Sequence, residues 1–354
     1  MLLLLLAISL SLGDATADPT KKKLKFLAYS PQFANSHVNF IGKISDTLVD
    51  AGHEVVMVSP LVDTSVGTAG TKRARVIELP QTPHAKEVQD NYHKTQMNMW
   101  ETHNGYTMVL DWIDMIDSWA DTCRGTINTP GLIENLRAEK FDVGYAESID
   151  FCAFGLFHLV GIKNVAITQS IAMIDGNYNF MNVPSMPSYV PTMIAGFHGD
   201  RMSFFQRMAN VIPIVLMDHY VATKTPAMEK VFKQFDASFP SLNGVMGNIS
   251  LVFLNSEPLV DFPRLTTHKI VEIGGIVNQG ERRPLNKTWS DILELRPKTV
   301  LLSFGTFVKA YMMPSEYKTT IRETLKKFPD VTFIWKYENK SVFTGDILYY
   351  FFHL

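Results

Sequence analysis

Near the start of the chain, a strand pattern gives way to a helix pattern and then returns. Leu24–Ser30 is a short apolar run that ends at Pro31, which predicts a buried strand. The apolar residues that follow recur at helical spacing, at Val38, Ile41, Ile44 and Leu48. Ala51–Gly52 ends this helix, and His53–Ser59 forms a second apolar run. Two apolar strands joined by a helix predict a parallel sheet that helices cover on both faces.

The same two patterns alternate along the chain as far as Ile273. Further helices are expected at about Pro83–Gly125, Leu132–Glu139 and Ser203–Lys233. Further strands are expected at Phe141–Ala146, Val165–Thr168, Leu251–Asn255 and Ile270–Ile273. Met181–Pro191 is rich in Pro, Ser and Asn and is expected to be an irregular loop.

A second strand–helix–strand unit follows a polar connector. The connector, Gly274–Lys298, contains a short helix around Trp289–Leu295. The unit itself is predicted as a strand, a helix and a strand, at Thr299–Phe304, Ser315–Phe328 and Val331–Lys336. We therefore expect a complete N-terminal domain at 18–276, a linker at 277–298, the start of a second domain at 299–340 and a tail of atypical sequence at 341–354.

The composition describes a globular chain with ample core. Hydrophobic residues make up 46% and charged residues 19% of the sequence. A net charge of −2 gives no electrostatic basis for binding nucleic acid or an anionic membrane surface. Cys123 and Cys152 are the two cysteines; an oxidising compartment would let them pair, but we favour two buried thiols.

The N-terminus has the features of a signal peptide. Leu2–Leu12 is apolar and Ala15–Ala17 is a small-x-small cleavage site, so we assign residues 1–17 to the signal. Three N-glycosylation acceptor triplets begin at Asn248, Asn286 and Asn339. No stretch of about twenty apolar residues provides a transmembrane helix. We therefore expect a glycoprotein of the secretory pathway, in the lumen of the endoplasmic reticulum.

One histidine lies where a parallel sheet binds its ligands. His37 follows the first predicted strand, in the first turn of the next helix, and open α/β sheets bind ligands beyond the carboxyl ends of their strands. The positive end of the helix dipole keeps such a histidine neutral and able to accept a proton. Glu147 ends the strand Phe141–Ala146 and is the candidate carboxylate that would fix its tautomer, with Asp150 as a second candidate. The alternative is a surface histidine and a solvated strand end, and the order of the strands decides between them.

Other kinds of site have less support. The sequence has no CxxC, HExxH or tight carboxylate cluster, so we predict no metal site, and it has neither a G-x-S-x-G elbow nor a P-loop. Ser303, Gly305 and Thr306 belong to a small-residue turn after a strand, which suits the approach of backbone amides to a phosphate. One helix face is rich in Met and Trp and forms either core packing or the lining of an apolar ligand site: Met108, Trp112, Met115 and Trp119.

Several segments of the chain form a recognisable series. In chain order these segments are Ser36–His37, Ala51–Pro60, Leu132–Glu147, Pro184–Phe204, Val260–Arg264, Val271–Ile276, Thr299–Thr306 and Phe328–Glu338. Taken together, they resemble the UDP-glucuronosyltransferases, within the wider UDP-glycosyltransferase family, and their nematode members in particular. The resemblance extends from about Leu24 to Glu338.

The resemblance implies a GT-B architecture, in which two Rossmann-like domains face each other across a cleft. It implies that the first domain binds a small lipophilic acceptor and the second a UDP-sugar, UDP-glucuronate or UDP-glucose, as co-substrate, with no bound cofactor. The sugar would pass to an acceptor hydroxyl with inversion and without a metal. His37 matches the base of the family, and Glu147 matches its partner carboxylate, which is often Asp. Ser303, Gly305 and Thr306 match one wall of the UDP site.

The chain departs from the family pattern after Lys340. The Trp-x-Pro-Gln, His-x-Gly and Asp-Gln signatures of the donor site are not found there, nor is the C-terminal membrane helix of the family. We therefore expect a C-terminally truncated member that is inactive alone. The alternatives are a non-catalytic acceptor-binding or regulatory chain that associates with full-length relatives, or an incomplete gene model.

Overall fold

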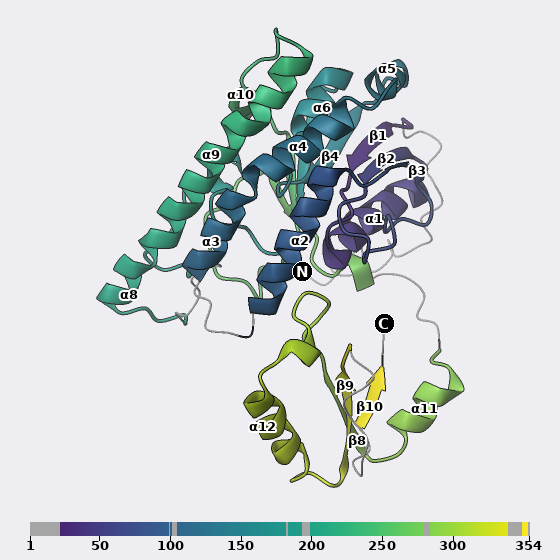
Figure 1. Cartoon of the computed structure of the whole chain (residues 1–354), viewed down its shortest axis with the longest axis vertical. Coiled ribbons are helices and arrows are strands. Elements are labelled where there is room, and N and C mark those ends of the chain that lie inside the picture. Colours follow the sequence, from purple (N-terminus) through teal and green to yellow (C-terminus); the bar gives the residue numbers. More distant parts are fainter. Residues whose placement is uncertain are drawn as a thin grey trace, which may run out of the picture.

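The larger of two sheets determines where the candidate site lies. The computed structural model describes residues 22–98, 100, 105–181, 183–192, 199–278, 284–338 and 349–352. Seven parallel strands are ordered β3-β2-β1-β4-β5-β6-β7 (Figure 1). Their bounds are β1 Lys25–Tyr29, β2 Glu54–Pro60, β3 Arg75–Leu79, β4 Val143–Glu147, β5 Asn164–Gln169, β6 Leu251–Leu254 and β7 Ile270–Glu272. The order reverses between β1 and β4, and open α/β sheets bind ligands at the carboxyl ends of the strands at such a point.

Helices cover both faces of this sheet, as the apolar strands predict. Along β1, Leu27 and Tyr29 pack into one core and Ala28 into the other, because successive side chains of a strand point to opposite faces. Helix α1 (Asn35–Asp50) packs on one face. The opposite face packs against α2 Pro83–Asn98, α4 Ile116–Ile127, α5 Leu132–Ala138, α6 Cys152–Val160, α7 Tyr178–Met181, α9 Val211–Phe235 and α10 Leu242–Gly247. Helices α3 (Gly105–Asp114) and α8 (Phe204–Ala209) contact α9.

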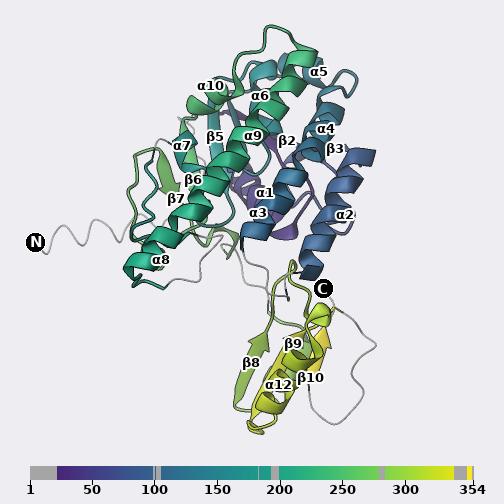
Figure 2. The same cartoon turned by 60° about the vertical axis from the view of Figure 1, so that its left-hand side comes forward.

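The helices α6 and α9 are in close contact. A Cβ atom on Gly155 of α6 would lie 2.0 Å from the ring of Phe232 of α9, so only glycine lets the two helices approach this closely. The ring of Phe232 is fully buried and stacks on Phe239, with 4.8 Å between the ring centroids. This packing holds α9 against the body of the domain (Figure 2).

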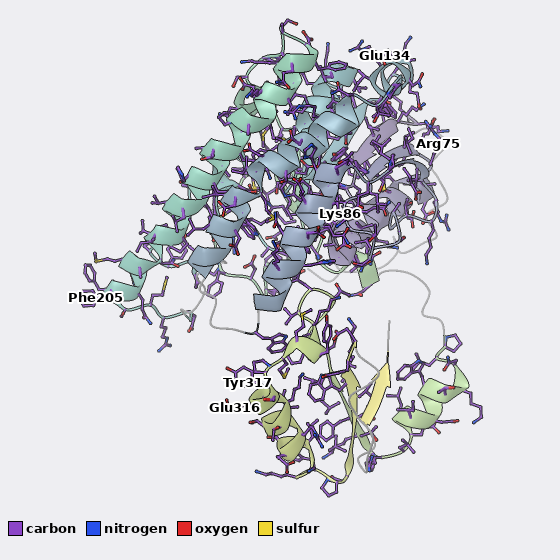
Figure 3. All side chains as sticks on the ribbon, viewed as in Figure 1. Arg75, Lys86, Glu134, Phe205, Glu316 and Tyr317 are labelled. Carbon is purple, nitrogen blue, oxygen red and sulfur yellow. A yellow bond between two sulfur atoms is a disulfide. The ribbon has the colours of Figure 1, made fainter. Side chains whose placement is uncertain are left out.

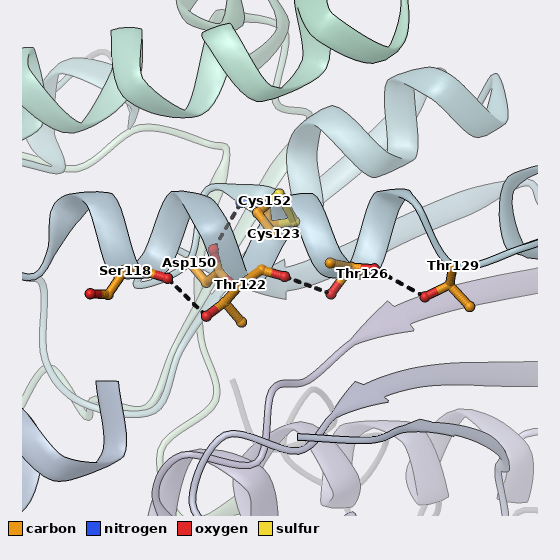
Figure 4. The surroundings of a disulfide bond; sticks show 8 residues. Ser118, Thr122, Cys123, Thr126, Thr129, Asp150 and Cys152 are labelled. Carbon is orange, nitrogen blue, oxygen red and sulfur yellow. Dashed lines mark hydrogen bonds between the residues drawn. A yellow bond between two sulfur atoms is a disulfide. The ribbon is translucent and has the colours of Figure 1, made fainter. Parts of the chain in front are cut away.

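A disulfide joins α4 to α6, which corrects the expectation of two free thiols. Cys123 and Cys152 have Cα atoms 5.5 Å apart although 29 residues separate them in the sequence (Figure 4). Both residues are buried, as expected. The apolar residues around each cysteine in the sequence indicate that it is buried. Whether the two helices lie close enough for their cysteines to bond depends on the whole fold.

A smaller parallel sheet forms the second unit. Its strands are β8 Lys298–Leu302, β9 Val331–Lys336 and β10 Tyr349–Phe352, in the order β10-β9-β8. Helix α11 (Lys287–Leu293) lies in the connector and α12 (Ser315–Leu325) between β8 and β9, while η1 (Ile276–Asn278) and η2 (Ala310–Met312) are short 3-10 helices. Strand β10 falls within the tail that the sequence analysis left without a predicted element.

The two units touch through α2 and the region that follows it. The indole Nε1 of Trp100 donates a hydrogen bond to the carbonyl oxygen of Lys309 at 2.7 Å. Its ring meets Phe304 edge-on at 5.0 Å, and Tyr92 lies 4.9 Å from Phe307. Each of these contacts joins an aromatic side chain of the first unit to the segment after β8.

Among the features of the first unit that were not predicted are strand β3, helix α6 and a division in a predicted helix. Strand β3 lies at the sheet edge and is only partly buried, and α6 is apolar all round, so neither has the periodicity of a half-buried element. The single helix expected at Ser203–Lys233 divides at Asn210. The buried amide of Asn210 donates to the carbonyl oxygens of Pro187 and Val190, which ties this break to the neighbouring loop.

Features expected for a secretory chain are only partly within the described residues. Asn248 and Asn286 are exposed, whereas Asn339 and the signal peptide at 1–17 lie outside the described residues. Across the part of the chain that the structure describes, no helix has the length and apolar character needed to cross a membrane.

Candidate functional site

The sheet brings His37 and Glu147 together at its switch point. His37 lies in the first turn of α1, directly after β1, and Glu147 is the last residue of β4. Because β1 pairs with β4, the segments after both strands meet at one edge of the sheet. The Nδ1 atom of His37 lies 2.6 Å from Oε2 of Glu147. The hydrogen bond therefore joins the two residues that the sequence analysis selected.

A third residue, Ser170, holds this pair in place. It follows β5, the other neighbour of β4. Its backbone amide donates to Oε1 of Glu147 at 2.8 Å, and its hydroxyl oxygen lies 2.8 Å from Nδ1 of His37. Sequence reasoning missed Ser170, although its place after a predicted strand was the signal that could have found it.

The geometry favours one tautomer of His37. The carboxylate of Glu147 is 4% exposed and accepts hydrogen bonds, so the Nδ1 atom of His37 carries the proton that lies between them. This leaves Nε2 with its lone pair, which is the arrangement of a general base. The side chain of His37 is 15% exposed, and its ring lies 4.8 Å from that of Phe33.

Asp150, the second candidate carboxylate, lies in different surroundings. Its Oδ1 accepts a hydrogen bond from the backbone amide of Cys152 at 2.9 Å. Burial raises the pKa of the Asp150 carboxyl, and the attraction of Lys224 opposes this rise. Glu147, and not Asp150, is the carboxylate that contacts His37.

A cavity of about 430 Å³ lies beside His37. Its walls include Trp112, Met115 and Trp119 from the Met- and Trp-rich helices. Met115 and Trp119 also belong to the main hydrophobic core, so these two side chains contribute to core packing and line the cavity at the same time. The side chain of Met108 lies outside the described residues. A mostly apolar cavity with a base in its wall suits a small ligand with an apolar body and an acidic proton.

The second unit contributes one end of this cavity. Thr306, Phe307 and Lys309 line it together with residues of the first unit. Ser303 and Gly305 lie in the same turn but not among the lining residues: the amide of Gly305 donates to Oγ of Ser303 at 3.3 Å, and its carbonyl accepts from Lys336 at 2.5 Å. Of the three residues expected at the donor wall, Thr306 therefore reaches the cavity.

A second histidine–carboxylate pair lies nearby and was not predicted. Nε2 of His93 lies 3.0 Å from Oδ2 of Asp63, whose side chain is 4% exposed and lines the cavity. Burial raises the pKa of the neighbouring Tyr92 hydroxyl, and the charges of Asp63 and Glu147 raise it further. Within the described residues, no group of three or more His, Cys, Asp or Glu side chains is placed to hold a metal ion.

Comparisons with known proteins agree with this architecture. A solved structure of the glycosyltransferase of kitacinnamycin has a TM-score of 0.54 and 14% identity, covering 94% of this chain and 71% of that one. The likeness shows the fold, which is of the GT-B type.

Sequence relatives give the family. Two Caenorhabditis elegans proteins named as UDP-glucuronosyltransferases, ugt-50 and ugt-55, are 29% and 26% identical to it over 88% and 91% of this chain. The chain spans 60% and 62% of the length of these relatives. The profile of the family described as UDP-glucoronosyl and UDP-glucosyl transferase matches residues 25–344. The chain therefore belongs to the UDP-glucoronosyl and UDP-glucosyl transferase family.

Proposed function

We propose that this chain serves in the transfer of a sugar from a UDP-sugar to a hydroxyl group of a small lipophilic acceptor, with His37 as the base. One observation carries the proposal. The Nδ1 atom of His37 is hydrogen-bonded to the buried Glu147 carboxylate, and His37 lies in the wall of an apolar cavity. Family membership supports the class of reaction.

The reaction follows from this geometry. The acceptor hydroxyl donates a hydrogen bond to Nε2 of His37, and its oxygen attacks the anomeric carbon of the sugar as the bond to the UDP oxygen breaks. The hydroxyl proton passes to Nε2, and UDP leaves with the electron pair of the broken bond. Glu147 then stabilises the imidazolium. A positioned base of this kind contributes roughly 10²–10⁴-fold to a rate.

The donor is proposed to be UDP-glucuronate or UDP-glucose. The turn after β8 supports the diphosphate part of this donor, since Thr306 borders the cavity and backbone amides in such turns approach phosphates. The disulfide supports a reaction in the secretory lumen, an oxidising compartment where disulfides persist.

A second candidate is acceptor binding without transfer, alone or in association with a longer relative. The observation that favours it is the composition of the cavity wall. Thr306, Phe307 and Lys309 are the second-unit residues that line it, whereas the rest of the lining comes from the first unit. Acceptor binding therefore depends mainly on residues of the seven-stranded sheet and its helices.

One experiment separates the two candidates. Binding of 2-naphthol to the purified chain is measured by calorimetry, and its glycoside is measured after incubation with radiolabelled UDP-glucuronate or UDP-glucose. We expect 2-naphthol to bind. Product formation by the chain alone would overturn the expectation, drawn from the sequence, that it is inactive alone, and such product should fall at least about 100-fold in His37→Ala and fall in Glu147→Gln. The exposed His219→Ala is the control. Binding without product favours the second candidate, and an absence of 2-naphthol binding contradicts both.

A further inference from the structure

We infer that the cavity contains an anion-binding subsite around Lys224, which selects acceptors that carry a carboxylate in addition to the reacting hydroxyl. The inference rests on the proposed function, because it names the class of acceptor. The subsite lies where α9 meets the turn after β4, and its residues are Lys224, Ser148 and Tyr220.

Lys224 is a buried cation whose described hydrogen-bond partners are neutral. It is 1% exposed and lines the cavity. Its Nζ donates to the carbonyl oxygen of Ile149 and, at 3.1 Å, to the hydroxyl oxygen of Tyr220. It also lies 4.6 Å from the centre of the Phe151 ring. An ammonium group is costly to bury without a counter-charge, so these contacts leave room for an anion.

The carboxyl group that acts on Lys224, that of Asp150, forms no direct ion pair with it in the part of the chain that the structure describes. Asp150 attracts Lys224, but its own carboxylate form is disfavoured by burial. A ligand carboxylate in the cavity would contact the ammonium group from the open side.

Two hydroxyl groups that line the same cavity as Lys224, those of Ser148 and Tyr220, have protons to donate. Ser148 Oγ accepts hydrogen bonds from Nε2 of Gln169 at 3.1 Å and from Nδ2 of Asn177 at 2.8 Å, which occupy its acceptor sites. Tyr220 accepts from Lys224. Among the described residues, no acceptor is found for either hydroxyl proton. Lys224, Ser148 and Tyr220 are therefore three hydrogen-bond donors that line one cavity and have little remaining capacity to accept hydrogen bonds. A carboxylate, which has four acceptor sites, is complementary to them.

The position of the subsite indicates the shape of the acceptor. His37 and Lys224 line the same cavity, whose walls include the rings of Trp112 and Trp119. An aromatic or alicyclic hydroxy acid can place its hydroxyl at His37, its apolar body among these rings and its carboxylate at Lys224. A cationic acceptor would be repelled by the ammonium group.

The test compares an acid with its neutral parent. Calorimetry at a pH of about 7 measures the affinity of the whole chain for 6-hydroxy-2-naphthoate and for 2-naphthol. We expect the wild type to prefer the naphthoate, and Lys224→Met to weaken naphthoate binding about 10- to 100-fold while 2-naphthol binding changes less than about twofold. Lys230→Met removes an exposed cation of the same helix and is the matched control for net charge.

The outcomes separate this subsite from the proposed function. If 2-naphthol binds but the naphthoate is not preferred and Lys224→Met changes nothing, the subsite is wrong and acceptor binding stands. If neither compound binds to the wild type, both proposals fail. If Lys224→Met loses 2-naphthol binding as well, the variant Ser148→Ala provides the test. A smaller preference for the naphthoate with unchanged 2-naphthol binding supports the subsite. An unchanged preference for the naphthoate overturns it.

Discussion

The strands of the two sheets are buried to different extents. In β2 of the larger sheet every residue after the first is buried, whereas in β8 of the smaller sheet Val300 is 47% and Leu301 61% exposed. Helix α12, which covers part of the smaller sheet, has no buried residue over its described length. Figure 3 shows its residues Glu316 and Tyr317 on the outer side of the unit.

The difference shows which unit depends on the other. The larger sheet has its own core on each face. The core of the smaller sheet has four fully buried members, Ala310, Met313, Trp335 and Tyr337, and Trp100 of the first unit packs against it. The second unit is therefore completed in part by a side chain of the first, and four experiments test this comparison.

The largest expected effect is the loss of a core ring from the first unit. Phe232→Ala removes a fully buried ring between α9 and α6 and should lower the free energy of unfolding by about 4 kcal/mol, through lost burial and a cavity. Phe328→Ala, the matched change at a side chain that is 50% exposed in the second unit, should cost less than about 1 kcal/mol. Urea denaturation measures the free energy of unfolding of both variants, and equal losses would contradict the difference in burial between the two units.

The next effect comes from the disulfide of the first unit. Cys123→Ala with Cys152→Ala should lower the free energy of unfolding by about 3 kcal/mol, since the bond restricts the unfolded chain over a separation of 29 residues. The free energy of unfolding of the wild type, measured by calorimetry with reductant, should match that of the variant measured without reductant. A variant as stable as the oxidised wild type would show that the bond is dispensable.

A smaller effect is expected where the two units meet. Trp100→Ala removes the hydrogen bond to Lys309 and the ring contact with Phe304, which should weaken docking by about 2 kcal/mol. Small-angle scattering should show a larger radius of gyration. Tyr317→Ala, at a side chain that is 48% exposed, is the control. An unchanged radius of gyration would mean that other contacts hold the units together.

The smallest effect is a pH dependence from the first unit. Burial raises the pKa of Asp150 in the folded chain above its unfolded value, so its stabilising contribution is complete below the unfolded pKa and is lost as the pH rises through the folded pKa. Asp150→Asn removes this loss. The free energy of unfolding of Asp150→Asn, relative to that of the wild type, should therefore increase as the pH rises above about 4. Urea denaturation in a pH series measures this difference. Parallel curves for the two proteins would show that Asp150 does not cause the dependence.

The sequence predicted the elements whose hydrophobic pattern is periodic. The strand–helix–strand unit around His37 was predicted correctly, because apolar residues at regular spacing mark buried faces. The GT-B fold was implied by the resemblance to the UDP-glycosyltransferases, and the comparison with a solved structure confirms it. Among the elements that were missed, β3 lies at the sheet edge, α6 is almost entirely apolar, and β10 falls outside the patterned part of the chain. The short helices α7 and α10, of four and six residues, were missed as well.

The sequence could identify candidate site residues at the ends of single strands, but not which strand ends lie together. His37 and Glu147 could be selected because each follows or ends a predicted strand, but their contact needs β1 to lie beside β4. Ser170 and the Asp63–His93 pair depend on the positions of three further segments. Pairing across long separations in the sequence is decided by the packing of the whole sheet, which no local pattern encodes.

The pairing of the strands also makes the contact between His37 and Glu147 depend on correct strand alignment. Tyr29 of β1 is opposite Ala146 of β4, and Glu147 is opposite Thr168 of β5. A slip of β4 by one residue would turn Glu147 to the other face of the sheet and away from His37. A copy of the chain that misfolds in this way would keep its secondary structure and lose the hydrogen bond between His37 and Glu147, so that bond reports whether β1 and β4 have been aligned correctly.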